Sequence, residues 1–174
     1  MTKTRGLWLA LAAAVFLSGC GTTKVSETPV RKGTTHSVRT IALAPSGGLL
    51  ADAVGVELFN RGYQVIDTAQ FSALMVRDNM SEIEVLAPQN LQKLQGQGID
   101  AILSAKTASD YEGNPKSASV RLTSTHNGQL LAGLTWQNAW GGMSGSIADR
   151  VMKKDLSETA EQIADDLTKQ LPPP

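Results

Sequence analysis

The sequence predicts a single α/β domain in which helices pack on a mixed β-sheet, and three observations support this. Short apolar segments typical of strands alternate with segments whose apolar residues recur at helical spacing, in the order strand, helix, strand, helix, helix, strand, hairpin, helix. No Pro-, Gly- or Ser-rich break divides residues 38–171. With 41% hydrophobic and 18% charged residues, the chain can bury a core without a metal or a disulfide.

The first half of the domain is expected to alternate strands and helices. The run at residues 38–44 becomes wholly apolar towards its end, which predicts a central strand. Residues 50–60 place their apolar side chains on one helical face, and a short strand is expected at residues 63–66. Asp67 and Gln70 have the spacing of an N-cap and its third-position partner, so they predict the start of the next helix.

The second half is expected to contain a hairpin. Pro88 suits the first position of a short helix, and residues 99–104 form the next strand. Residues 117–125 and 129–136 alternate in polarity on either side of Asn127-Gly128. Asn-Gly between two such runs predicts a tight turn in which both central residues adopt positive φ.

The chain is expected to end in an amphipathic helix whose apolar residues extend from Leu156 to Leu171, followed by three prolines. Its acidic first turn is stabilised by the helix dipole. Five apolar residues of the domain are expected in its core: Leu58, Leu74, Ile102, Ile163 and Leu167.

Residues 1–19 have the features of a bacterial signal peptide. A basic start is followed by an apolar run at residues 7–16, which is too short to span a bilayer, and then by Leu17-Ser18-Gly19-Cys20. These four residues resemble the lipobox of bacterial lipoproteins. The resemblance implies cleavage before Cys20 and acylation of Cys20, the chain's only cysteine. The alternative is an ordinary secretory signal with a chance cysteine.

The predicted organisation is therefore a lipoprotein signal peptide at residues 1–19, a lipidated flexible tether at residues 20–37 and an α/β periplasmic domain at residues 38–174. The tether is rich in Thr, Ser, Lys and Pro. The precursor carries 16 basic and 16 acidic residues, and loss of Lys3 and Arg5 would leave the mature chain slightly acidic. Without a basic run, nucleic acid is not expected as a partner.

Several motifs of the domain together resemble the periplasmic domain of the curli-secretion lipoprotein CsgG. They are the first strand ending at Ala44-Pro45, the segment Arg61–Asp67, the segment Gly98–Leu103 and the hairpin at Asn127–Leu130. The amino-terminal domain of TolB, the activator LpoB and the export lipoprotein PelC share this domain type. The resemblance covers most of residues 38–171.

The resemblance implies a non-enzymatic envelope protein. Two features of the chain distinguish between the CsgG, LpoB and PelC types. The chain has no room for the membrane hairpins of CsgG-type pores, and its tether is much shorter than the long arm of LpoB-type activators. The build is nearer to PelC-type lipoproteins, which are ring-forming accessories of an export system.

Residues suited to catalysis or metal binding are few, so no enzyme activity, cofactor or metal is expected. His36 lies in the predicted tether and His126 at the hairpin turn, where both are expected to be exposed to solvent. Asp165 and Asp166 are adjacent on a helix, so their side chains should diverge onto a solvated face. No nucleophile, zinc or phosphate-loop motif occurs.

The segment from Leu134 to Gly145 contains two of the three tryptophans. In one interpretation, Trp136 ends a strand in the core and Trp140 covers the sheet edge. In the other, Trp140 and Met143 lie on an exposed loop and dock against the lipid interface or a neighbouring subunit.

Three functions are compatible with these observations. The first is a lipid-anchored accessory or scaffold of an envelope export or assembly system, which would self-associate or bind other envelope proteins. The second is an LpoB-like regulator of a periplasmic peptidoglycan synthase, and the third is a stress-related or enzymatic lipoprotein acting alone. Because no aspartate follows Cys20, the periplasmic side of the outer membrane is expected.

Overall fold

The computed structural model describes residues 23–27, 37–111, 113–138, 146–147 and 152–174. The α/β domain consists of Lys24–Asn138 and Lys154–Pro174. Met1–Thr23 and Ala139–Lys153 belong to a separate unit, of which few residues are described.

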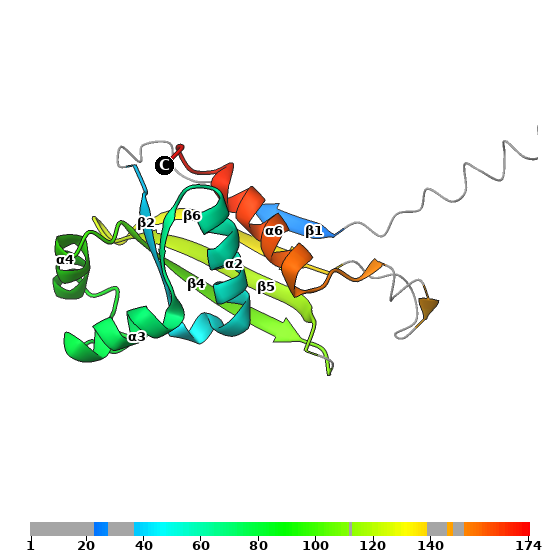
Figure 1. Ribbon diagram of the computed structural model, residues 1–174, viewed down its shortest axis with the longest axis horizontal. Coiled ribbons are helices and arrows are strands. Elements are labelled where there is room, and N and C mark those ends of the chain that lie inside the picture. The colour runs from blue at the N-terminus through cyan, green and yellow to red at the C-terminus, as the bar shows by residue number, and fades with distance from the viewer. Residues whose placement is uncertain (1–22, 28–36, 112, 139–145, 148–151) are drawn as a thin grey trace, which may run out of the picture. The chain divides into compact units, whose positions relative to one another are not determined.

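The described residues of the domain form a six-stranded mixed sheet with helices packed on it, which confirms the predicted fold class (Figure 1). The strand order is β1-β6-β5-β4-β2-β3. β2 is parallel to β3 and β4, whereas the neighbours β4 and β5, β5 and β6, and β6 and β1 are antiparallel. The strands are β1 (Lys24–Glu27), β2 (Thr40–Leu43), β3 (Gln64–Ile66), β4 (Ala101–Ser109), β5 (Pro115–Ser124) and β6 (Leu130–Gln137).

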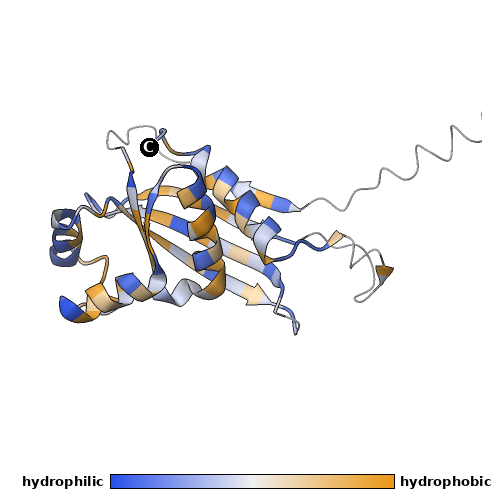
Figure 2. Cartoon of the chain, viewed as in Figure 1, coloured by the Kyte–Doolittle hydropathy of each residue, from blue (hydrophilic) through white to orange (hydrophobic). Residues whose placement is uncertain are grey.

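Two layers of helices enclose two apolar clusters. In the first cluster, α2 and α6 pack on β4, β5 and β6. In the second cluster, α3 and α4 pack beside β2 and the start of β4. Figure 2 shows the contrast between the hydrophobic residues along β2 and the mostly hydrophilic α4. The helices are η1 (Pro45–Gly47), α2 (Gly48–Asn60), α3 (Thr68–Arg77), α4 (Pro88–Gly96) and α6 (Leu156–Thr168).

The local signals for helix starts are confirmed. The Asp67 side chain accepts a hydrogen bond from the Gln70 N–H at 2.7 Å and begins α3. Pro88 is the first residue of α4. α6 begins with a complete capping box, because the Asp155 and Glu158 side chains each accept the other's backbone N–H. α6 ends at Thr168, so the expected helical extent to Leu171 was too long.

The hairpin is confirmed, but its tight turn is not. The Ser124 N–H donates to the Gln129 carbonyl and the Gly128 N–H donates to the Ser124 carbonyl, which closes a longer loop. Of the two residues Asn127 and Gly128, only Gly128 has a positive φ, at 69°. Asn127 instead accepts the Gln129 N–H through its side chain, a local bond that stabilises the loop without positive φ.

Residues 24–27 contradict the prediction of an unstructured tether from residue 20 to residue 37. They form β1, an edge strand that pairs Lys24 with Gln137 and Glu27 with Leu134. The only apolar side chain of the strand, Val25, packs against the core beside Trp136. Pairing with a distant strand therefore orders a segment whose composition alone favours a coil.

Four of the five predicted core residues are fully buried. Leu58, Ile102, Ile163 and Leu167 are at most 3% exposed. Leu74 is only partly buried, because Phe71 and Met75 occupy the face of α3 that points into the core.

Candidate interaction surfaces

Three residues proposed from the sequence as functional, Cys20, Trp140 and Met143, lie outside the described residues and stay predictions. Trp136 is described, and its placement in the core is confirmed. Its side chain is fully buried, and its indole N–H donates to the Gln162 side chain at 3.1 Å. The buried indole nitrogen is thus satisfied, as a core tryptophan requires.

His126 is less exposed than predicted. Its side chain is 23% exposed, its Nδ1 lies 2.7 Å from the Gln95 amide nitrogen, and its Nε2 lies 3.8 Å from an Asp100 carboxylate oxygen. Asp100 also accepts the backbone N–H groups of Arg39 and Thr40. The hairpin loop therefore contacts Gln95 of α4 and Asp100 just before β4, and Asp100 in turn binds the start of β2. This arrangement gives His126 a structural role. His36 lies outside the described residues.

The two adjacent aspartates of α6 diverge as predicted, but only one lies on a solvated face. Asp165 accepts hydrogen bonds from Arg61, whereas Asp166 is 8% exposed and pairs with Lys169 at 2.6 Å. The Asp166 carboxylate raises the pKa of Lys169. Neither aspartate is placed to act with the other as an acid and base pair.

Arg61 connects α2 to α6. Its guanidinium contacts the Glu57 carboxylate at 2.6 Å and the Asp165 carboxylate at 2.5 Å. Burial lowers the pKa of Arg61, but the hydrogen bonds to Glu57 and Asp165 outweigh this effect and raise it. The network keeps one cation between two acidic side chains and fixes the relative position of the two helices.

Four strand ends meet at one end of the sheet. Lys24 pairs with Gln137, Gln137 with Ser117, and Ser117 with Ala108. β1 therefore begins where β6 ends, and the turn from β4 to β5 lies at the same end (Figure 1). The sequence after Cys20 enters the domain here, and the sequence that continues to Trp140 leaves it here.

One face of the long strands is not covered by the described helices. The strand registers align its side chains in two rows across the strands: Ala108, Ser117, Gln137 and Lys24 in one, and Lys106, Ser119, Thr135 and Ser26 in the next. A third row contains Ser104, Arg121 and Gly133. We call these rows the open sheet face. Its cations are Lys24, Lys106 and Arg121, and the three rows contain no carboxylate.

The open sheet face is shallowly hollowed. A depression of about 390 Å³ lies over β4, β5 and β6, with Lys106, Ser119 and Thr135 in its lining. This surface was not among the sites predicted from the sequence, although the alternation that predicted the hairpin also indicates which of its residues point away from the core. Every second residue from Ser117 to Thr123 is Ser, Arg or Thr, which is typical of a strand face turned away from the core.

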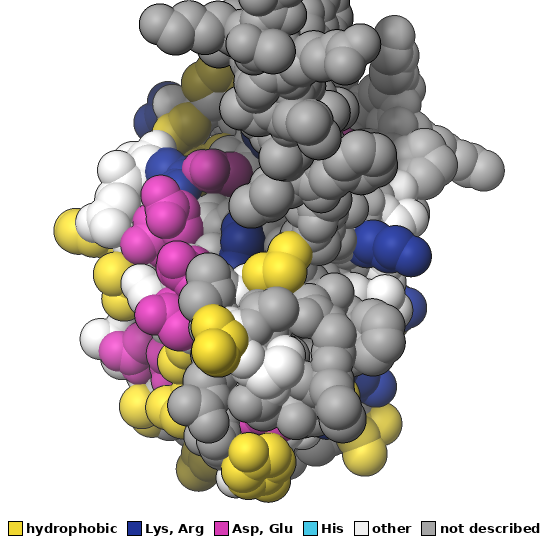
Figure 3. Space-filling model, turned by 90° about the vertical axis from the view of Figure 1, so that its right-hand side faces the viewer, with side chains coloured by type: hydrophobic (Ala, Val, Ile, Leu, Met, Phe, Trp, Pro, Cys, Tyr) yellow, Lys and Arg dark blue, Asp and Glu magenta, His cyan; other side chains and the backbone are white. Residues whose placement is uncertain are grey.

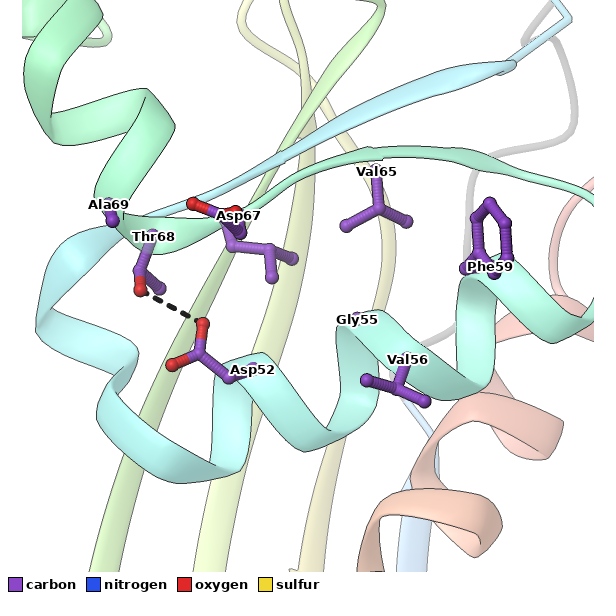
Figure 4. Close-up of a pocket in the computed structure, with 9 residues that line it drawn as sticks. Asp52, Gly55, Val56, Phe59, Val65, Asp67, Thr68 and Ala69 are labelled. Carbon is purple, nitrogen blue, oxygen red and sulfur yellow. Dashed lines mark hydrogen bonds between the residues drawn. The ribbon is translucent and has the colours of Figure 1, made fainter.

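An apolar groove lies at the opposite edge of the sheet, between α2 and β3. Its volume is about 440 Å³, and Val56, Phe59 and Val65 contribute side chains to it (Figure 4). The polar groups at its end already have partners. Thr68 donates to Asp52 at 2.9 Å, and Asp67 caps α3. These carboxylates therefore have structural roles in the groove.

Within the described ranges, no cluster of three or more His, Cys, Asp and Glu residues could hold a metal ion. None of the described helices combines the length and apolar character that crossing a membrane requires.

Comparisons with known proteins find similar structures but no family. The chain matches no protein-family model and no curated protein. Among solved structures, it is similar to the PelC dodecamer from Paraburkholderia phytofirmans, with 17% identity, a TM-score of 0.47, and 86% of this chain and 98% of that chain covered. It is also similar to lipoprotein GNA1162 from Neisseria meningitidis, with 20% identity, a TM-score of 0.45, and 74% and 98% covered.

TolB from Acinetobacter baumannii is a further match, with 13% identity and a TM-score of 0.46. The match covers 85% of this chain but 30% of TolB. The sequence resemblance named PelC and TolB, and both are among the similar structures. At these identities the similarity concerns the fold, so the function has to be argued from residues of this chain.

Proposed function

We propose that this protein is a lipid-anchored accessory of an envelope export or assembly system, held on the periplasmic side of the outer membrane through Cys20 and able to associate with itself. The observation that supports the anchor is the order of a basic start, a short apolar run and Leu17-Ser18-Gly19-Cys20. One acyl chain anchors a protein weakly, whereas the two or three chains expected at Cys20 anchor it firmly.

The start of β1 supports a position close to the membrane. β1 begins at Lys24, four residues after Cys20, and an extended chain over this distance spans at most about 14 Å. A regulator of the LpoB type must reach a distant peptidoglycan synthase, so this short connection favours the accessory function over the regulator.

Trp140 and Met143 are proposed to dock against the lipid interface beside the anchor. The segment that contains them follows β6, and β6 ends at the end of the sheet where β1 begins. Tryptophan is favoured at membrane interfaces because its ring is apolar and its N–H is polar. The lipid on Cys20 and an apolar loop would then contact the same membrane.

Self-association is supported by the open sheet face. A polar and cationic sheet surface that the described helices leave uncovered is suited to contact another macromolecule. PelC, one of the similar structures, is a dodecamer; for this chain the support comes from its own surface.

The anchor is tested by replacing the thiol. Cys20→Ala should abolish incorporation of a labelled fatty acid and either release the protein from the membrane fraction or leave an unprocessed precursor. Thr22→Ala, two residues away, serves as the matched control and should keep both label and location. Labelling of Cys20→Ala as strong as that of the wild type would refute the anchor.

The docking loop is tested on a fragment from Gly21 to Pro174 that lacks the lipid. Trp140→Ala and Met143→Ala should leave its melting temperature nearly unchanged and weaken co-flotation with vesicles of outer-membrane lipids. Strong destabilisation by Trp140→Ala would instead indicate a core position, with a loss of roughly 3–5 kcal/mol. Unchanged flotation would remove both residues from the functional surface.

A further inference from the structure

We propose that copies of this chain associate head to tail, so that the open sheet face of one copy covers the acidic helix face of the next. The proposal rests on the self-association in the proposed function and names the two surfaces that carry it. The acidic helix face is the outward side of α6 with the adjoining end of α2. It consists of Glu57, Arg61, Lys154, Glu158, Glu161, Asp165 and Lys169, together with the mostly buried Asp166 that pairs with Lys169.

The open sheet face has the character of one half of a polar interface. Its three cations are exposed and are separated by short hydroxyl and amide side chains. No ion pair joins Lys24, Lys106 or Arg121 to a described carboxylate within 4.0 Å. The cationic charge of this face is therefore not neutralised by described residues of the same domain.

The acidic helix face has the opposite character. Five carboxylates and three cations lie on this face. Arg61 contacts Glu57 and Asp165, and Lys169 contacts Asp166. The third cation, Lys154, donates to the neutral Gln162 side chain. Glu161 is exposed and forms no ion pair with another described residue. A shallow depression of about 360 Å³ runs along this surface, with Glu158 and Glu161 in its lining.

The two faces lie on opposite sides of the sheet. α2 and α6 cover one side, and the open sheet face is the other side. Figure 3 shows acidic side chains gathered along one side of the domain, with some Lys or Arg side chains beside them, and further Lys or Arg side chains on the opposite side. Each face would repel a second copy of itself, because the open sheet face has three cations and no carboxylate, and the acidic helix face has five carboxylates and three cations. Complementary faces on opposite sides of one chain give a head-to-tail contact, which closes into a ring or extends as a filament.

Charge reversal on either face tests the contact in the full chain, purified in mild detergent. Lys106→Glu with Arg121→Glu makes the open sheet face acidic, and Glu158→Lys with Glu161→Lys makes the acidic helix face basic. Each double variant alone should associate at least about tenfold more weakly than the wild type by sedimentation velocity. Lys93→Glu on α4, outside both faces, is the matched control and should associate as the wild type does.

Mixing the two double variants tests directly whether the two faces contact each other. Each variant then meets a complementary face on the other, so the 1:1 mixture should regain association that neither variant shows alone. The melting temperature of the sheet-face variant should stay near that of the wild type, which separates lost contact from lost folding. Glu158→Lys removes the capping box of α6, so the single variant Glu161→Lys, which keeps it, should also associate more weakly and should melt near the wild-type temperature. In the wild type, association should weaken as salt is raised.

Two outcomes would overturn the proposal. One is an unchanged oligomer in both double variants, and the other is a mixture that stays as dissociated as its components. Loss of binding to a polyanion by the sheet-face variant, with association unchanged, would assign this face to a different partner. Fatty-acid labelling of Cys20 is unaffected by any of these results, so failure of this contact is distinguishable from failure of the proposed anchor.

Discussion

The two halves of the sheet are built differently, and the difference indicates which half is a scaffold and which can form contacts. In the covered half, β2, β3 and the start of β4 have helices on both faces. In the open half, which is the rest of β4 with β5, β6 and β1, the described helices cover one face. Ile41, Ala42 and Leu43 are all buried, whereas burial alternates along β5. A strand buried on both faces has no surface for a partner, so contacts are expected in the open half.

The largest expected effect concerns the helix-covered face of the open half. Trp136 is fully buried there, so Trp136→Ala should lower the free energy of unfolding by about 3–5 kcal/mol. Trp136→Phe keeps most of the volume and loses the hydrogen bond to Gln162, and should cost clearly less. Chemical denaturation measures both. Equal costs for the two variants would contradict the account, because volume would then not be the main factor.

A second prediction tests the close packing of the covered half. A Cβ on Gly55 would lie 2.5 Å from the Leu43 side chain and 3.3 Å from that of Val65. Gly55→Val should therefore separate α2 from the sheet and cost about 1–3 kcal/mol. Gly96→Ala at the end of α4 is the matched control, since no atom lies within 4 Å of its new Cβ. A neutral Gly55→Val would show that this half is packed more loosely than the structure indicates.

The smallest effect concerns pH and the link between α3 and α4. Hydrogen bonds from Arg77 and then Gln97 hold the pKa of Asp78 below its ordinary value of 3.8. The carboxylate therefore stabilises the folded chain at pH values above 3.8, and this contribution is lost as pH falls through the lowered pKa. Asp78→Asn should be less stable than the wild type at neutral pH, and the difference should shrink in acid. A difference that does not change with pH would exclude this origin.

The sequence predicted the covered half well because its signals are local. The apolar run of β2, the Asp67 cap and Pro88 each report on a few neighbouring residues, and all three are confirmed. β1 was missed because its four residues contain one apolar side chain and its order depends on pairing with β6, far along the chain. The hairpin turn was mistaken in type because side-chain bonding by Asn127 competes with the positive φ of a tight turn.

The candidate surfaces were predicted less completely than the fold. Alternation in β5 indicated which side chains point away from the core, but only the registers of β4, β5 and β6 bring Lys106 and Arg121 onto one face. The acidic helix face likewise depends on Arg61, which joins two helices that are distant in sequence. A surface made by several elements can be predicted only once the topology is known, whereas a helix cap or a strand with a continuous apolar run can be predicted from neighbouring residues.

The most direct test of the head-to-tail contact is a cross-link between the two faces. Thr135 is exposed on the open sheet face, and Ser157 is exposed on α6 one turn before Glu161. Because the two positions lie on opposite sides of the sheet, a full chain in which Cys20 is replaced by Ala and which carries Thr135→Cys and Ser157→Cys should form a ladder of multimers on mild oxidation. Each single variant on the same Cys20→Ala background should stay monomeric under denaturing electrophoresis. A dimer formed as readily by Thr135→Cys alone, or the absence of any ladder in the double variant, would contradict the account.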